Sequence, residues 1–150
     1  MRGLSLSFFV MIFFSSAAIA DNGLISIKSY YSVSVTADRL ENNLKKKGMT
    51  VFVRINHTEG AIKAGKKLRP TELIVFGNPK VGTPLMQCRQ SVAIDLPQKA
   101  LIWQDENEQV WLSYNDPSYV AKRHGINKCD EVINKITNTL SNFSRAATAQ

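Results

Sequence analysis

The stretch Phe76-Gly77-Asn78-Pro79-Lys80-Val81-Gly82-Thr83-Pro84-Leu85-Met86 carries the most unusual local chemistry of this 150-residue chain. Its first part, Gly77-Asn78-Pro79, is a turn sequence. Thr83 followed by Pro84 is typical of a helix start, because proline is tolerated at the first helical position. The apolar run just upstream, residues 72–76, indicates a short strand. We therefore predict a strand, a tight loop and a helix with Thr83 as its N-cap.

Upstream of this stretch, two segments alternate apolar and polar side chains, which is the pattern of a half-buried strand. They cover residues 24–35 and 49–57. The helix between them is expected to be capped by Thr36 and to end at Gly48, because these residue types suit the two helix ends. A short helical turn is expected over residues 59–64.

Downstream, residues 100–104 and 109–114 indicate a β-hairpin. Asp116-Pro117 starts a short predicted helix, and a final helix is predicted over residues 128–143. Its buried stripe would be Cys129, Val132, Ile133, Ile136, Leu140 and Phe143. The tail, residues 145–150, is expected to fray. This order predicts one domain of the α+β class: a mostly antiparallel sheet with helices packed on one face.

The N-terminus has the pattern of a secretory signal peptide over residues 1–20. A positive charge at Arg2 precedes the apolar run 8–14, and Ala18-Ile19-Ala20 is a small-x-small cleavage sequence. The run is shorter than the roughly 20 residues that span a bilayer. We expect cleavage after Ala20 and export of a domain of residues 21–150 to the periplasm or the cell exterior. No second apolar stretch indicates an integral membrane segment.

The formal net charge of +7 and the pI of about 9.6 are compatible with nucleic acid, an anionic membrane surface or acidic partners. The basic residues form only short runs, of which 45–47 lies at a predicted helix C-terminus, where cations suit the helix dipole. Export excludes most nucleic-acid roles. The sequence favours a soluble basic protein without a nucleic-acid partner.

Several recurrent features come in the order typical of one family. These features are the stretch 76–86, Ile55-Asn56-His57 followed by Ala61, Asp95-Leu96-Pro97, Trp103-Gln104-Asp105 and Tyr114-Asn115-Asp116-Pro117. With them, the chain resembles the domain of unknown function 302 family over residues 24–143. The resemblance implies a β-α-β4-α order like half of the TATA-binding-protein fold, and the family has no established activity. Likeness to the fold of a DNA-binding protein is not evidence of DNA binding.

The loop of residues 77–83 is the first candidate ligand site. Its glycines free the backbone, and it opens a helix N-terminus, which presents unpaired N–H groups to an anion. Lys80 adds a positive charge. The alternative is a tight structural turn, which also explains the Gly and Pro residues. The predicted ligand-binding residues are His57, Gly77, Asn78, Lys80, Gly82 and Thr83.

His57 ends a predicted strand two residues before Glu59, so it is a candidate to contact a ligand or to act as a general base. The alternative is a histidine that hydrogen-bonds a nearby turn. His124 is expected to complement a helix dipole beside Lys122 and Arg123. The histidines and cysteines lack metal-ligand spacing, and no nucleophile motif is present, so we expect neither a metal nor a cofactor.

Three functions follow as hypotheses. The first is a non-catalytic binding or interaction module for a small anionic ligand or a partner protein. The second is an enzyme that uses His57 as its base. The third is a homo-oligomer that pairs sheet faces carrying Tyr30, Phe52 and Arg54.

Cys88 and Cys129 are the two cysteines of the chain. An even count in an oxidising compartment favours a disulfide between them. Both lie on predicted core-facing helix stripes, so the bridge would tie the final helix to the helix after the loop. The alternative is two buried free thiols.

Overall fold

The chain folds around one five-stranded antiparallel sheet with the strand order β1-β5-β4-β3-β2. The structure, a computed structural model, describes residues 22–150, so the predicted signal peptide and its cleavage site lie outside the described residues. The strands are β1 (Leu24–Lys28), β2 (Thr50–Asn56), β3 (Thr71–Gly77), β4 (Gln98–Gln104) and β5 (Val110–Asn115). The helices are α1 (Val33–Lys46), α2 (His57–Lys63), α3 (Pro79–Cys88), the 3₁₀ helix η1 (Gln90–Asp95), α4 (Pro117–Arg123) and α5 (Asp130–Thr148).

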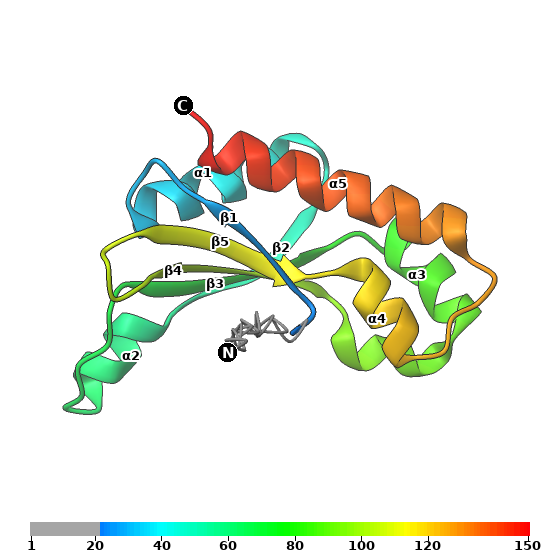
Figure 1. The fold of residues 1–150 in the computed structure, drawn as a ribbon, viewed down its shortest axis with the longest axis horizontal. Coiled ribbons are helices and arrows are strands. Elements are labelled where there is room, and N and C mark those ends of the chain that lie inside the picture. The colour runs from blue at the N-terminus through cyan, green and yellow to red at the C-terminus, as the bar shows by residue number, and fades with distance from the viewer. Residues whose placement is uncertain (1–21) are drawn as a thin grey trace, which may run out of the picture.

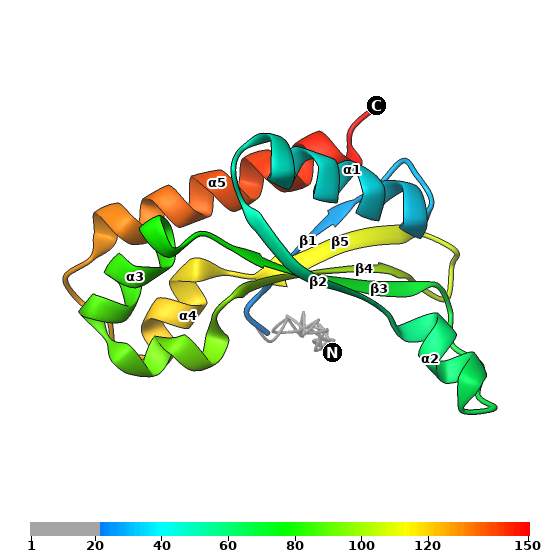
Figure 2. The ribbon, with the colours of Figure 1, turned by 180° about the vertical axis from the view of Figure 1, so that it is seen from behind.

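Helices α1 and α5 lie side by side over one face of the sheet (Figure 1), and the view from behind shows the same layering (Figure 2). Helix α2 projects at one end of the sheet, whereas α3 and α4 gather at the other. The core forms where alternate strand residues meet the apolar stripes of the two long helices. The predicted α+β class and antiparallel sheet with helices on one face are confirmed. The fully buried side chains include Leu40, Leu44, Ile74, Phe76, Ile102 and Leu112.

The predicted strand over residues 24–35 is wrong in its second half. The strand ends at Lys28, and α1 begins at Val33 after Ser32, whose hydroxyl accepts a hydrogen bond from the Val35 N–H. Thr36, predicted as the cap, lies inside the helix and donates its hydroxyl to the Ser32 carbonyl over 2.8 Å. The alternation of polar and apolar residues continued past the strand, but the apolar residues from Val33 onward also fit helical spacing. Burial of that helical stripe decided the structure.

Helix α3 begins at Pro79, five residues before Pro84, the predicted first residue of the helix. Asn78 is its N-cap, and Pro79 takes the first helical position that we assigned to Pro84. Pro84 therefore lies inside the helix, where a proline removes one internal hydrogen bond.

The predicted fraying of residues 145–150 is also wrong, because α5 continues to Thr148. Ala147 and Thr148 are buried. The Arg39 guanidinium of α1 donates to the carbonyl oxygens of Ala146, Ala147 and Ala149 over 2.9–3.0 Å. These bonds satisfy carbonyls that a helix C-terminus leaves without partners.

Candidate functional site

A cavity of about 280 Å³ lies where α3, η1 and α5 meet one end of the sheet. The first residues of β2 and β4 and the last residues of β3 form its floor, and α5 closes the opposite side. Its walls are almost entirely apolar, which is typical of sites for small organic ligands. The main apolar residues are Met49, Phe52, Phe76, Met86, Leu96 and Leu140.

A β-bulge places Phe52 at this cavity. Val51 pairs with Phe76 and Val53 pairs with Val75, so Phe52 is an extra residue of β2 without a partner on β3. Its side chain lines the cavity and remains 55% exposed, which puts it at the mouth.

The loop before α3 also borders the cavity, but its backbone donors are in use. The Lys80 N–H donates to the Asn78 side-chain oxygen, and the Val81 and Gly82 N–H groups donate to the Asn78 carbonyl, all over 2.9 Å. Pro79 has no N–H. The first turn of α3 thus has no free N–H for an anion, and the predicted anion site rests on Lys80 alone, whose side chain is exposed.

The structure separates the two parts of the predicted ligand site. Gly77, Asn78, Gly82 and Thr83 line the cavity, whereas His57 starts α2 at the opposite end of β2. Thr50 pairs with Gly77 and Asn56 pairs with Glu72, so the two places are about 17 Å apart at 3.3–3.4 Å per strand residue. The expectation that His57 lies near the loop is therefore wrong. Both His57 and Glu59 are exposed.

The match to a known family rests on most of the described chain. The sequence model of the family described as "Domain of unknown function DUF302" matches residues 25–143. The chain belongs to the DUF302 family. The crystal structure of an uncharacterized conserved DUF302 protein from Bacillus stearothermophilus has the same fold as this DUF302 domain: the TM-score is 0.76 at 19% identity, over 84% of this chain and 98% of that one.

Curated relatives of the DUF302 domain include proteins named fluoride-specific ion channel FluC 1 from Brucella suis biovar 1 and FluC 2 from Brucella melitensis biotype 1. Each is 46% identical over 116 residues, which is 77% of this chain but only 46% and 43% of those proteins, respectively. The chain thus spans less than half of the length of these relatives. The channel activity is named for those proteins alone. Within residues 22–150, every helix is too short or too polar to cross a membrane.

Arg54 is bound by acidic side chains of β3 and α1 in the DUF302 domain. Its guanidinium, on β2, donates to Glu72 of β3 over 2.6 Å, and also to Asp38 and Glu41 of α1. The hydrogen bond to Glu72 is the main cause of a raised pKa at Arg54. Tyr30 lies in the turn after β1, and Phe52 lies at the cavity mouth. Tyr30 therefore lies outside the strands and not on a sheet face as predicted, whereas pairing between subunits through faces that carry Phe52 and Arg54 stays a prediction.

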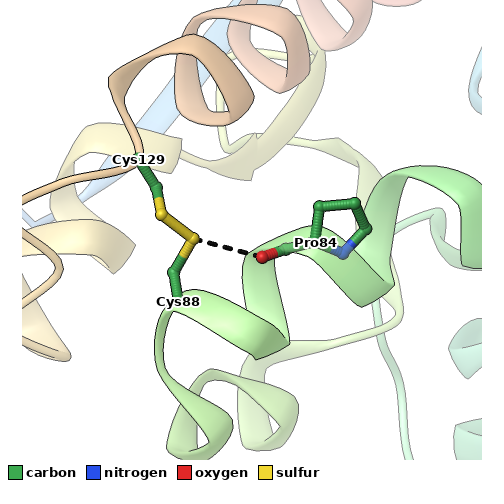
Figure 3. The surroundings of a disulfide bond; sticks show 3 residues. All are labelled: Pro84, Cys88 and Cys129. Atoms are coloured by element: carbon green, nitrogen blue, oxygen red, sulfur yellow. Dashed lines mark hydrogen bonds between the residues drawn. A yellow bond between two sulfur atoms is a disulfide. The ribbon is translucent and has the colours of Figure 1, made fainter.

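The DUF302 domain contains the predicted disulfide, between Cys88 and Cys129 (Figure 3), with 6.4 Å between the two Cα atoms. It ties the last residue of α3 to the residue just before α5, the two helices that enclose the cavity. Both cysteines are half-buried and not in the core. The Cys88 sulfur lies 3.1 Å from the Pro84 carbonyl oxygen.

The sequence reasoning missed one cluster, formed by Ser91, Asp95 and His124. These residues come from η1 and the end of α4 and are joined by two hydrogen bonds. His124 lies 29 residues after Asp95 and 33 residues after Ser91, a spacing that matches no local motif. Only the fold therefore brings His124 to the other two residues. His124 does end α4, as predicted, but its ring also bonds to Asp95. Within residues 22–150, no three His, Cys, Asp or Glu side chains are grouped so as to hold a metal ion.

Proposed function

We propose that this protein is exported and that its cavity between α3 and α5 is a non-catalytic binding site for a small, mostly apolar molecule. The observation that carries the proposal is the apolar lining of a cavity of about 280 Å³. This volume is close to the lower limit of about 300 Å³ for sites that take small organic molecules. The export of residues 21–150 to the periplasm or cell exterior is part of the proposal and is supported by the N-terminal sequence pattern.

A ligand with an acidic group at one end fits the cavity best. Lys80 is exposed and does not itself line the cavity, but its neighbours Pro79 and Val81 do, so its backbone lies next to the rim. Thr83 and Thr139 are polar residues of the lining. An apolar body would occupy the cavity, and a carboxylate or sulfonate would lie toward Lys80.

Two matched dyes test this proposal on the purified protein. N-phenyl-1-naphthylamine is neutral, and 1-anilinonaphthalene-8-sulfonate is the same molecule with an acidic group. We expect saturable fluorescence enhancement with both, because each ring system is apolar, and tighter binding of the sulfonate. Absence of saturable binding of both dyes would overturn the proposal.

Neighbouring residues of η1 provide the control for location. Ala93 is exposed and lines the cavity, whereas Ile94 is 73% exposed and does not line it. Ala93→Trp should fill the mouth and weaken binding of both dyes at least about tenfold, while Ile94→Trp should leave it unchanged. Equal binding by both variants would place the dye elsewhere and contradict the assignment.

Lys80 is tested separately from the cavity. Lys80→Ala should weaken binding of the sulfonate dye and leave binding of the neutral dye unchanged, because only the sulfonate is attracted by the positive charge that the variant removes. Lys63→Ala, at the far end of the sheet on α2, is the control. Equal effects of Lys80→Ala on both dyes would contradict the proposal that the ligand has an acidic group near Lys80. The proposal that an apolar body occupies the cavity would still hold.

A further inference from the structure

Ser91, His124 and Asp95 form a hydrogen-bonded series outside the cavity. The Ser91 hydroxyl lies 3.0 Å from Nδ1 of His124, and Nε2 of the same ring lies 2.6 Å from a carboxylate oxygen of Asp95. Ser91 and Asp95 belong to η1, and His124 ends α4. Neither Ser91 nor His124 lines the apolar cavity.

The carboxylate determines which ring nitrogen carries the proton. An ionised carboxylate only accepts hydrogen bonds, so Nε2 of His124 must donate to it. The other oxygen of Asp95 lies 3.2 Å from the Arg123 guanidinium. In the neutral imidazole, Nδ1 then has a free lone pair and accepts the Ser91 hydroxyl proton.

The three side chains differ in their exposure to solvent. The side chains of His124 and Asp95 are only 8% and 12% exposed, so their mutual bond is shielded from water. Ser91 is exposed. An accessible hydroxyl held by a shielded, oriented base is the arrangement that activates a nucleophilic serine.

We propose that Ser91 is a nucleophile activated by His124, and that it reacts with small carboxylic esters. The Ser91 oxygen attacks the ester carbonyl carbon while its proton passes to Nδ1 of His124. The bond from the acyl carbon to the leaving oxygen then breaks, and the leaving alcohol takes that proton. Water hydrolyses the acyl-Ser91 by the same route, which releases the carboxylic acid and restores the hydroxyl. Asp95 is a positioning residue.

Ser118 is the matched control, because it is an exposed serine on α4 whose hydroxyl bonds to a carboxylate and not to an imidazole. Its hydroxyl donates to Asp116 over 2.7 Å. The two serines differ in the base that faces them, so a difference in reactivity between them reports on His124.

A fluorophosphonate probe and p-nitrophenyl acetate test the proposal on the purified protein. The probe forms a bond from phosphorus to the serine oxygen with loss of fluoride, and mass spectrometry of peptides locates the adduct. General-base assistance typically contributes 10²–10⁴-fold, so we expect Ser91 to be labelled about 100-fold faster than Ser118. Ser91→Ala should abolish hydrolysis of the ester, and Ser118→Ala should not change it. Labelling of Ser91 no faster than of Ser118 would overturn the proposal.

Variants of the other two residues separate chemistry from structure. His124→Ala should reduce labelling to the level of Ser118, and added imidazole should restore part of it, because free imidazole supplies a base but no tertiary contact. Asp95→Asn should slow labelling, and Asp95→Glu should retain more of the rate because it keeps a carboxylate. Labelling that is unchanged in His124→Ala would show that this ring is not the base.

Discussion

The Phe52 ring lies 3.5 Å from the position that a Cβ atom would occupy on Gly77. The bulge in β2 thus turns an aromatic ring toward the one residue at the end of β3 that has no side chain. A Cβ at this position would also lie 3.5 Å from Pro97. Phe52, Gly77 and Pro97 all line the cavity, so the space at Gly77 helps to set its width.

Gly77→Val is therefore expected to weaken binding of N-phenyl-1-naphthylamine at least about tenfold. The added Cβ contacts both Phe52 and Pro97, and the two methyl groups of valine must extend into the cavity or displace the Phe52 ring. Gly60→Val on α2 is the control, since nothing lies within 4 Å of its added Cβ. Fluorescence titration measures the affinities. Unchanged binding in Gly77→Val would show that the dye does not occupy this end of the cavity.

Arg54→Met should lower the free energy of unfolding by about 2–3 kcal/mol, because it leaves the Glu72 carboxylate, which is buried, without its cation. The Arg54 side chain is 27% exposed, so the loss should be less than for a fully buried pair. The double change Arg54→Met with Glu72→Met should recover part of the loss, because no buried charge is left unpaired. Urea unfolding of the wild type and the two variants measures these differences, and a double variant no more stable than Arg54→Met would contradict the prediction.

Alkaline pH should destabilise the domain through Tyr114. Burial raises the pKa of this phenol above its ordinary value of 10.0, so the unfolded chain releases the proton first as the pH rises. Stability is then fully present below about pH 10 and declines above it. Tyr114→Phe should flatten this decline between pH 10 and 11, as measured by urea unfolding. Tyr30→Phe is the control, since Tyr30 is 66% exposed, and it should keep the wild-type decline. If stability declined with pH equally steeply in Tyr114→Phe and in the wild type, the decline would not be caused by Tyr114.

Reduction of the Cys88–Cys129 bridge should lower stability by roughly 4 kcal/mol, because the bridge closes a loop with a sequence separation of 41. At about 3 °C per kcal/mol this corresponds to a melting temperature lower by roughly 12 °C. Thermal unfolding with and without a dithiol measures it, and Cys88→Ala with Cys129→Ala should match the reduced protein. The denatured, unreduced protein should show no reactive thiol, and detection of two would exclude the bridge.

The sequence predicts the sheet well where burial follows a period of two, as at Ile74 and Phe76 of β3. It fails where two periods fit the same residues: Val33 and Val35 extend the alternation of β1, yet Val33 also starts the buried stripe of α1. At α3, both Asn78-Pro79 and Thr83-Pro84 have the chemistry of a helix start, and the local sequence does not choose between them.

The candidate sites show the same limit. Gly77, Asn78, Gly82 and Thr83 were found from turn chemistry, and they do line the cavity. Its apolar character, however, comes from Phe52, Met86 and Leu140, which are contributed by three separate elements. Ser91 and His124 meet only because η1 and the end of α4 lie at the same end of the sheet. Tertiary proximity of this kind has no signature in a single sequence.

The hydrogen bonds from Arg39 to the last turn of α5 have a consequence for biosynthesis. Arg39 bonds to carbonyl oxygens 107–110 residues further along the chain, so the ribosome releases α1 long before its partner exists. Until residue 149 has been made, the apolar stripe of α1 lacks the helix that lies beside it in the folded domain. Translation thus separates the synthesis of α1 from that of α5, and the two helices can pack together only after residues 130–149 have been made.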